Sequence, residues 1–183
     1  MSTTAIPPRP TPAAEPGGAG RAYGGPMTWA DVCAHPALQD LPFKIEQDRF
    51  GRILMSPPAT PHARRQGKLI VLLQAALGGE AFPEAPIETA EGVRVPDVVW
   101  MSERFAASHG DESPLRVAPE VCVEVRSPSD PWREMEEKVT LYLARGAQEV
   151  WVCEPDGRLR FFGHEGERSR STLVPDAPTS VTL

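Results

Sequence analysis

The sequence predicts an α/β domain with a mixed central β-sheet flanked by helices, preceded by an N-terminal helix and a β-hairpin. Short apolar runs of strand length alternate with segments of helical spacing, and a strand, a helix and a further strand follow one another after residue 118. The chain has 183 residues, 40% of them hydrophobic, which is enough for one domain with a sizeable core.

Residues 1–26 differ in composition from the rest of the chain. They are mostly Pro, Gly, Ala, Ser and Thr, and Ile6 is almost their only large aliphatic residue. Such a segment cannot bury enough apolar surface to offset the entropy lost on ordering. We expect a disordered tail at 1–26 and a single folded domain at 27–183.

The folded part is predicted to begin with a helix at 27–38, capped by Thr28, and a hairpin with Gly51 in its turn. A longer helix follows, with Thr60 as a candidate cap, Pro61 in its first turn, leucines at helical spacing and Gly78 at its end. The later predicted elements are strands at 86–89, 94–101 and 119–126, a helix from 130 to 145 that Ser129 and Asp130 could cap, a hairpin of 149–153 with 159–162, and a short strand near 180–183.

Charge and cysteine content restrict the class of protein. The net charge is −6, so any contact with nucleic acid must be local, because nonspecific affinity grows with the number of phosphates neutralised. The longest apolar runs are far shorter than the roughly 20 residues that span a bilayer, and no signal segment opens the chain. Three cysteines without Cys-x-x-Cys spacing indicate a reducing compartment. We expect a cytoplasmic protein outside the membrane.

Two carboxylates interrupt apolar strands that follow one another in the chain. Asp97 precedes Val98-Val99-Trp100, and Glu124 lies in a Val-Cys-Val-Glu-Val run, on the face opposite the three valines. Taken alone, Asp97 also fits a strand-end aspartate that accepts bonds from backbone amides, and Glu124 also fits a half-exposed residue paired with Arg126.

Together, two carboxylates in one desolvated place would raise each other's pKa, and a hard cation would relieve the repulsion. Magnesium often accepts only one or two protein carboxylates and completes its shell with water and phosphate. The pattern therefore favours a Mg²⁺ site, with Mn²⁺ as a substitute, suited to phosphodiester hydrolysis.

Lys138 is a charged residue inside the apolar arc of the last predicted helix. Its side chain either extends along the apolar surface to reach solvent or points at an acidic site. Beside two carboxylates and a metal, its ammonium could orient the attacking water or stabilise negative charge on the phosphoryl group.

These residues lie in segments that resemble the Uma-two family of restriction endonucleases, which belongs to the PD-(D/E)XK nuclease superfamily. The similar segments are Lys44-Ile45-Glu46, residues 52–58, Pro61-His62, Val95-Pro96-Asp97, residues 123–130, Glu137-Lys138 with Tyr142 and Gly146, and residues 149–152. The resemblance implies a restriction-endonuclease-like core, magnesium ligands at Asp97 and Glu124, and a catalytic lysine at Lys138.

The resemblance also suggests Glu46 as a further acidic member of the catalytic site, although a surface charge opposite Lys44 explains that residue equally well. One position departs from the superfamily pattern, which places lysine two residues after the glutamate, where this chain has Arg126. Arginine stays protonated and cannot act as a base. In the Uma-two pattern the lysine comes instead from the following helix, so the resemblance implies that Lys138 reaches the same point from that helix.

One stretch of this acidic chain is basic enough to contact phosphates. Residues 44–68 contain six basic and two acidic side chains. Within it, His62, Arg64, Arg65 and Lys68 lie in the first turns of one predicted helix and are candidate nucleic-acid contacts. A solvated helix face explains the same arginines and lysine, and His62 also fits a structural residue.

The sequence thus predicts a Mg²⁺-dependent DNA endonuclease. The alternative is a catalytically weak or inactive nuclease-fold module that binds DNA or a protein partner. Because cutting two strands usually requires two active sites, the superfamily resemblance also leads us to expect a homodimer.

Overall fold

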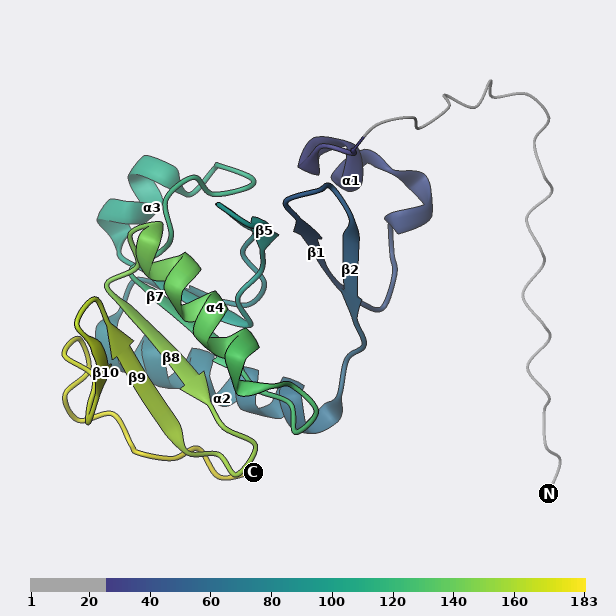
Figure 1. The fold of residues 1–183 in the computed structure, drawn as a ribbon. Helices are drawn as coiled ribbons and strands as arrows, with labels where there is room; N and C mark the ends of the chain where they lie inside the picture. The colour runs from purple at the N-terminus through teal and green to yellow at the C-terminus, as the bar shows by residue number, and fades with distance from the viewer. Residues whose placement is uncertain (1–25) are drawn as a thin grey trace, which may run out of the picture.

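The computed structural model describes residues 26–183, so the predicted tail lies outside the described residues except for Pro26. The chain forms two β-sheets and four α-helices within this range (Figure 1). The helices are α1 (Trp29–Ala34), α2 (Thr60–Leu77), α3 (Glu103–His109) and α4 (Trp132–Ala144). The strands are β1 (Lys44–Asp48), β2 (Ile53–Ser56), β3 (Glu80–Phe82), β4 (Ile87–Thr89), β5 (Gly92–Arg94), β6 (Val98–Met101), β7 (Val121–Val125), β8 (Glu149–Cys153), β9 (Leu159–Gly163) and β10 (Gly166–Arg168).

The larger sheet has six strands in the order β10-β9-β8-β7-β6-β3. Only β7 and β8 pair in parallel, and the other neighbours are antiparallel. A parallel pair needs a long crossover, which α4 supplies between β7 and β8. The mixed central sheet flanked by helices that the sequence predicts is therefore confirmed.

Helices cover both faces of this sheet, with α4 in front of it and α2 behind it in Figure 1. On the α4 side, Met135, Val139 and Tyr142 pack with Cys122 of β7. On the α2 side, Leu69 and Leu73 pack with the three valines of β7. Because both faces are covered, β7 is apolar on both, and Glu124 is the exception.

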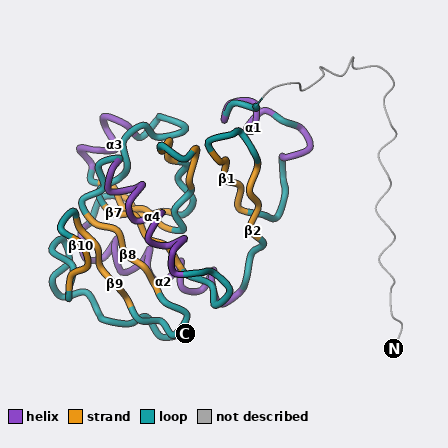
Figure 2. The backbone as a smooth tube through the Cα atoms, in the orientation of Figure 1, coloured by secondary structure: helices purple, strands orange, loops and turns teal. Residues whose placement is uncertain are grey.

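The smaller sheet has the order β2-β1-β5-β4 and carries the predicted N-terminal hairpin, which lies to one side of the main sheet (Figure 2). Gly51 closes the hairpin turn with a φ of 79°, a conformation that costs glycine little. Neither buried apolar cluster includes a residue of β1 or β2. The hairpin is therefore held by the β1–β5 ladder within the smaller sheet and by polar contacts in the candidate site.

The predicted strand at 94–101 is wrong in one respect that matters for the site. The chain leaves β5 at Arg94, passes through Pro96 and Asp97, and enters β6 at Val98, so the segment belongs to two different sheets. Proline has no N–H to donate to a strand ladder, which favours a break at this point. Asp97 is therefore held at the crossing between the sheets.

The predicted helix ends are confirmed in part. Thr28 caps α1 in a reciprocal capping box with Asp31, and α2 ends at Gly78 with a φ of 66°. Thr60 is not a cap, because α2 begins at that residue and Ala59 precedes it without a side-chain bond. Pro131 precedes α4, and there too no side-chain hydrogen bond caps the helix.

Ser129 and Asp130 therefore do not cap α4 as predicted. Asp130 instead accepts a hydrogen bond at 3.0 Å from the backbone N–H of Ser127. The carboxylate thus closes the turn between β7 and α4 and leaves the first helical N–H groups without a side-chain acceptor.

Three short elements were not predicted, namely β3, α3 and β10, and the predicted strand at 180–183 is only a single bridge between Arg158 and Ser180. The chain before this bridge, near Ser171, is held by Glu149, a fully buried residue at the start of β8. Its carboxylate accepts bonds from Trp151 Nε1 at 2.9 Å and Ser171 Oγ at 2.6 Å. The contact with Ser171 joins two segments far apart in the chain, so strand periodicity gives no sign of it.

Cys33, Cys122 and Cys153 are all free thiols, and Cys122 and Cys153 are buried. No helix within residues 26–183 has the length and apolar character needed to cross a membrane.

Leu73→Ala should test the packing of α2 on the main sheet. Leu73 is fully buried, so we expect the free energy of unfolding to fall by about 2 to 5 kcal/mol. Val71→Ala is the matched control on the same helix, because Val71 is 68% exposed and should change stability by less than about 0.5 kcal/mol. Urea denaturation measures both, and equal losses would contradict this packing.

Candidate active site

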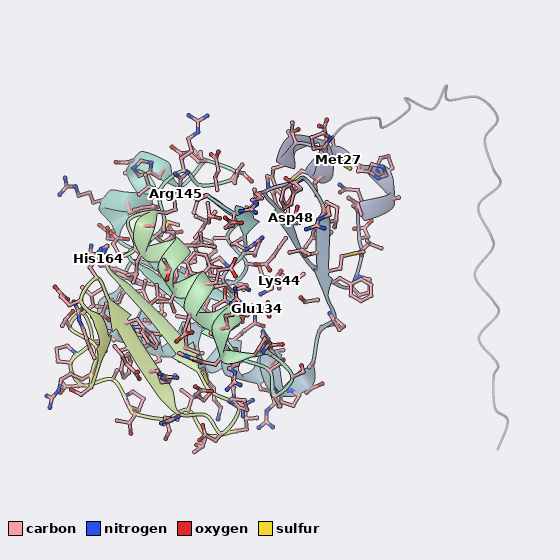
Figure 3. The ribbon with its side chains drawn as sticks, in the orientation of Figure 1. Met27, Lys44, Asp48, Glu134, Arg145 and His164 are labelled. Carbon is pink, nitrogen blue, oxygen red and sulfur yellow. The ribbon has the colours of Figure 1, made fainter. Side chains whose placement is uncertain are left out.

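The four predicted catalytic residues line one cavity of about 350 Å³ beside the crossing between the two sheets. They are Glu46, Asp97, Glu124 and Lys138. Lys44 and Glu134 also line it and mark its β1 and α4 sides in Figure 3. Residues far apart in the sequence are thus brought together by β1, β7, α4 and the β5–β6 crossing.

Asp97 is 1% exposed and accepts polar contacts on both carboxylate oxygens. Oδ1 lies 2.6 Å from Lys44 Nζ and 3.2 Å from His62 Nε2. Oδ2 accepts the backbone N–H of Val125 at 2.7 Å, which connects the crossing to β7. The bond to a backbone amide that one interpretation anticipated is present, together with the contacts that place Asp97 in the cavity.

Glu124 is 2% exposed on the α4 face of β7. Its Oε1 accepts the Tyr142 hydroxyl at 2.7 Å, and its Oε2 lies 3.3 Å from Lys138 Nζ. Arg126 makes its ion pair with Glu154 at 2.7 Å instead. The alternative of a half-exposed Glu124 paired with Arg126 is therefore wrong.

Lys138 does not extend to solvent. It is 7% exposed, and its Nζ lies 3.3 Å from Glu124 and 3.3 Å from Glu46. Glu46 is 6% exposed and also accepts the Val95 N–H at 2.8 Å, so the surface-charge interpretation of this residue is wrong too. One lysine thereby connects β7 to the N-terminal hairpin.

Lys44 is the residue that sequence reasoning missed as a member of this site, since it was named only in a basic stretch, in a family-like segment and as a surface charge opposite Glu46. Its Nζ lies between the two predicted metal ligands, 2.6 Å from Asp97 and 4.0 Å from Glu124. Lys44 and Glu46 are two apart on a strand and so share a face. That alternation is the signal that could have placed Lys44 beside the acidic cluster.

The environments of the two carboxylates move their pKa values in opposite directions. Burial would raise the pKa of Asp97, but the Lys44 charge and the His62 contact outweigh it and hold the pKa below its ordinary value. Burial raises the pKa of Glu124 to about 7, although Lys138 and Lys44 act against the shift. The expectation that each carboxylate would raise the other's pKa fails for Asp97.

Both lysines stay protonated. Burial would lower the pKa of Lys44, but Glu124, Asp97 and Glu46 together raise it. The pKa of Lys138 is also raised, because Glu124 and Glu46 outweigh burial and the Lys44 charge. Two ammonium groups therefore face three carboxylates.

The predicted nucleic-acid residues separate into different environments. His62 lines the cavity through its contact with Asp97, and Arg64 is exposed on α2. Arg65 donates to the Pro155 carbonyl at 2.6 Å, and Lys68 donates to the Thr182 carbonyl. Arg65 is therefore engaged with the turn between β8 and β9 and Lys68 with the C-terminal segment, and the structure does not bring the four together as one patch.

The donor set fits a hard cation with a small number of protein ligands. Within residues 26–183 no group of three or more His, Cys, Asp or Glu side chains is arranged to hold a metal ion. Asp97 and Glu124 do supply oxygens to a shared cation, because the Lys44 ammonium already contacts both. Two carboxylates with water and phosphate suit Mg²⁺.

Glu124→Gln should remove a pH dependence of stability in chelator-treated protein. A pKa of about 7, raised from 4.5, means that the folded chain holds this proton more tightly than the unfolded chain. The stability from this group is therefore complete below pH 4.5 and lost as the pH rises through 7, a loss on the order of 3 kcal/mol.

The measurement is the free energy of unfolding in urea from pH 5 to pH 8. We expect the unmodified chain to lose stability relative to Glu124→Gln across this window, whereas parallel profiles would refute the raised pKa.

Comparison with known proteins agrees with this architecture. A solved structure titled as a "putative nuclease belonging to DUF820" from Anabaena variabilis matches with a TM-score of 0.59 and 16% identity, over 74% of this chain and 86% of that one, and so shares the fold. A search of curated proteins gave no match. The family model described as "Uma2: Putative restriction endonuclease" matches residues 36–182. The chain therefore belongs to the Uma2 family.

Proposed function

We propose that this protein is a Mg²⁺-dependent DNA endonuclease that hydrolyses phosphodiester bonds with water, and that Mn²⁺ can replace Mg²⁺. The observation that carries the proposal is the convergence of Asp97, Glu124 and Lys138, all more than nine-tenths buried, on one cavity. Membership of a family described as restriction endonucleases supports nuclease chemistry in general.

Asp97 and Glu124 would hold the metal, which when bound supplies charge stabilisation at the phosphoryl oxygen and a more acidic bound water. Asp97 is the permanently ionised ligand, because its pKa is low. Glu46 fixes Lys138 through a 3.3 Å contact, and Lys138 directs its ammonium to Glu124 from α4. An ammonium in this position can orient the attacking water and stabilise charge that develops on the phosphate.

His62 is the one predicted DNA contact that also lines the cavity, and its 26% exposed ring touches Asp97. It can therefore support the aspartate or meet a phosphate entering from solvent. Arg64, Arg65 and Lys68 remain proposed DNA contacts, with Arg64 the most available of the three. A homodimer and a cytoplasmic location also remain proposals.

A second candidate is a nuclease-fold module that binds DNA or a protein without turnover. The observation in its favour is that the Lys44 and Lys138 ammonium groups lie close enough to compensate the charges of the two carboxylates. An acidic chain with an internally neutralised site has less need of a divalent ion.

Supercoiled plasmid distinguishes the two functions. Purified protein with Mg²⁺ or Mn²⁺ should nick it, and Asp97→Asn should lower the rate at least about 100-fold, because a neutral amide is a far weaker metal ligand and the loss of a charged ligand removes several kcal/mol of stabilisation. Asp111→Asn is the matched control, since Asp111 is exposed beyond α3. Equal background nicking by all three proteins supports the binding module instead.

Lys44→Met tests whether the ammonium and the metal compete for the same oxygens. Without metal, the melting temperature should fall by on the order of 10 °C, because two buried carboxylates lose a counter-charge. Added Mg²⁺ should then raise the melting temperature of Lys44→Met more than that of the unmodified chain. Lys68→Met is the control, and an identical Mg²⁺ response in all three proteins would exclude competition at this site.

A further inference from the structure

A second cavity of about 380 Å³ adjoins the candidate active site. It shares Glu46, Glu134 and Lys138 with the first cavity, so the two lie on either side of the same side chains. Its remaining charged lining includes Arg94, from the end of β5, and Arg133, from the first turn of α4.

The positive charge of Arg94 has no ion-pair partner among the described residues. The residue is 9% exposed, and its Nη1 donates to the Gln47 carbonyl at 3.0 Å, a neutral acceptor. No carboxylate within residues 26–183 lies within 4.0 Å of its guanidinium. An arginine cannot shed its proton to escape burial, so the uncompensated charge is costly unless an anion meets it.

The other groups at this cavity also favour an anion next to Arg94. Arg133 is exposed and makes no ion pair among the described residues, which leaves its guanidinium available to a ligand. No side chain caps α4, and although the Glu134 N–H donates to the Pro131 carbonyl at 3.0 Å, the positive dipole end of the helix lies at this cavity. Glu134 and Glu137 line the cavity too, but both are exposed and remain solvated when they turn outward, a freedom that the buried Arg94 lacks.

We propose that Arg94 and Arg133 form a phosphate-binding subsite that holds a nucleic-acid phosphodiester neighbouring the one in the active-site cavity. The proposal rests on the proposed nuclease function for its choice of ligand. Nucleic acid fits better than an isolated anion, because a strand carries a phosphate about every 3.4 Å of helix axis and can occupy two adjoining cavities at once. The forked guanidinium also matches phosphate oxygens in pairs.

The test measures binding of a fluorescent single-stranded 20-nucleotide DNA to the full chain in chelator, over a range of NaCl concentrations. Arg94→Gln and Arg133→Gln should each weaken binding about tenfold at low salt and lower the salt slope by about 0.7, the value for one lost contact with a single strand. Arg94→Lys should recover part of the affinity. Arg104→Gln, an exposed arginine on α3, is the matched control and should leave both quantities unchanged.

Arg133→Gln keeps the test decisive if Arg94→Gln folds poorly, because Arg133 is exposed. Unchanged affinity and slope for Arg133→Gln, with metal-dependent plasmid nicking intact in the unmodified chain, would overturn the subsite and leave the proposed function standing. Absence of both DNA binding and nicking in the unmodified chain would overturn both. Weakened binding with an unchanged Mg²⁺-induced rise in melting temperature supports a phosphate contact separate from the metal ligands.

Discussion

The structure depends on the neutralisation of buried carboxylates where the two sheets meet. Asp97 and Glu124 are almost fully buried, and a charge in such a place is tolerated only when it is paired and hydrogen-bonded. Lys44 and Lys138 provide the opposite charges from two different elements, and Tyr142 and a backbone amide provide further donors. Loss of one partner would leave an uncompensated charge in the core.

The same contacts explain how the N-terminal hairpin is held. Because β1 and β2 contribute nothing to the two apolar clusters, the hairpin is joined to the rest of the chain by the β1–β5 ladder and by the ion pairs of Lys44 with Asp97 and of Glu46 with Lys138. The same side chains hold the hairpin in place and line the candidate active site, so the site forms only when the hairpin is in position. Any change at this site therefore has to be assessed for stability before it is assessed for activity.

Environment, rather than residue type, gives the two carboxylates different properties. Asp97 stays ionised because Lys44 and His62 contact it, whereas burial raises the pKa of Glu124 into the neutral range. Such a separation is the usual way in which paired acids acquire separate tasks. The solved structure titled as a "putative nuclease" shares the fold, but at 16% identity the chemistry has to be argued from these side chains.

Sequence by itself determined the parts of this protein that local patterns encode. Alternation in β7 placed Glu124 opposite the valines, helical spacing put Lys138 inside an apolar arc, and the family resemblance joined both to Asp97 and Glu46. Tertiary structure alone decided the break at Pro96, the position of Lys44 between two carboxylates and the engagement of Arg65 and Lys68 with loops. These outcomes depend on which segments meet across two sheets, and pairing between distant strands leaves no periodic trace in the chain.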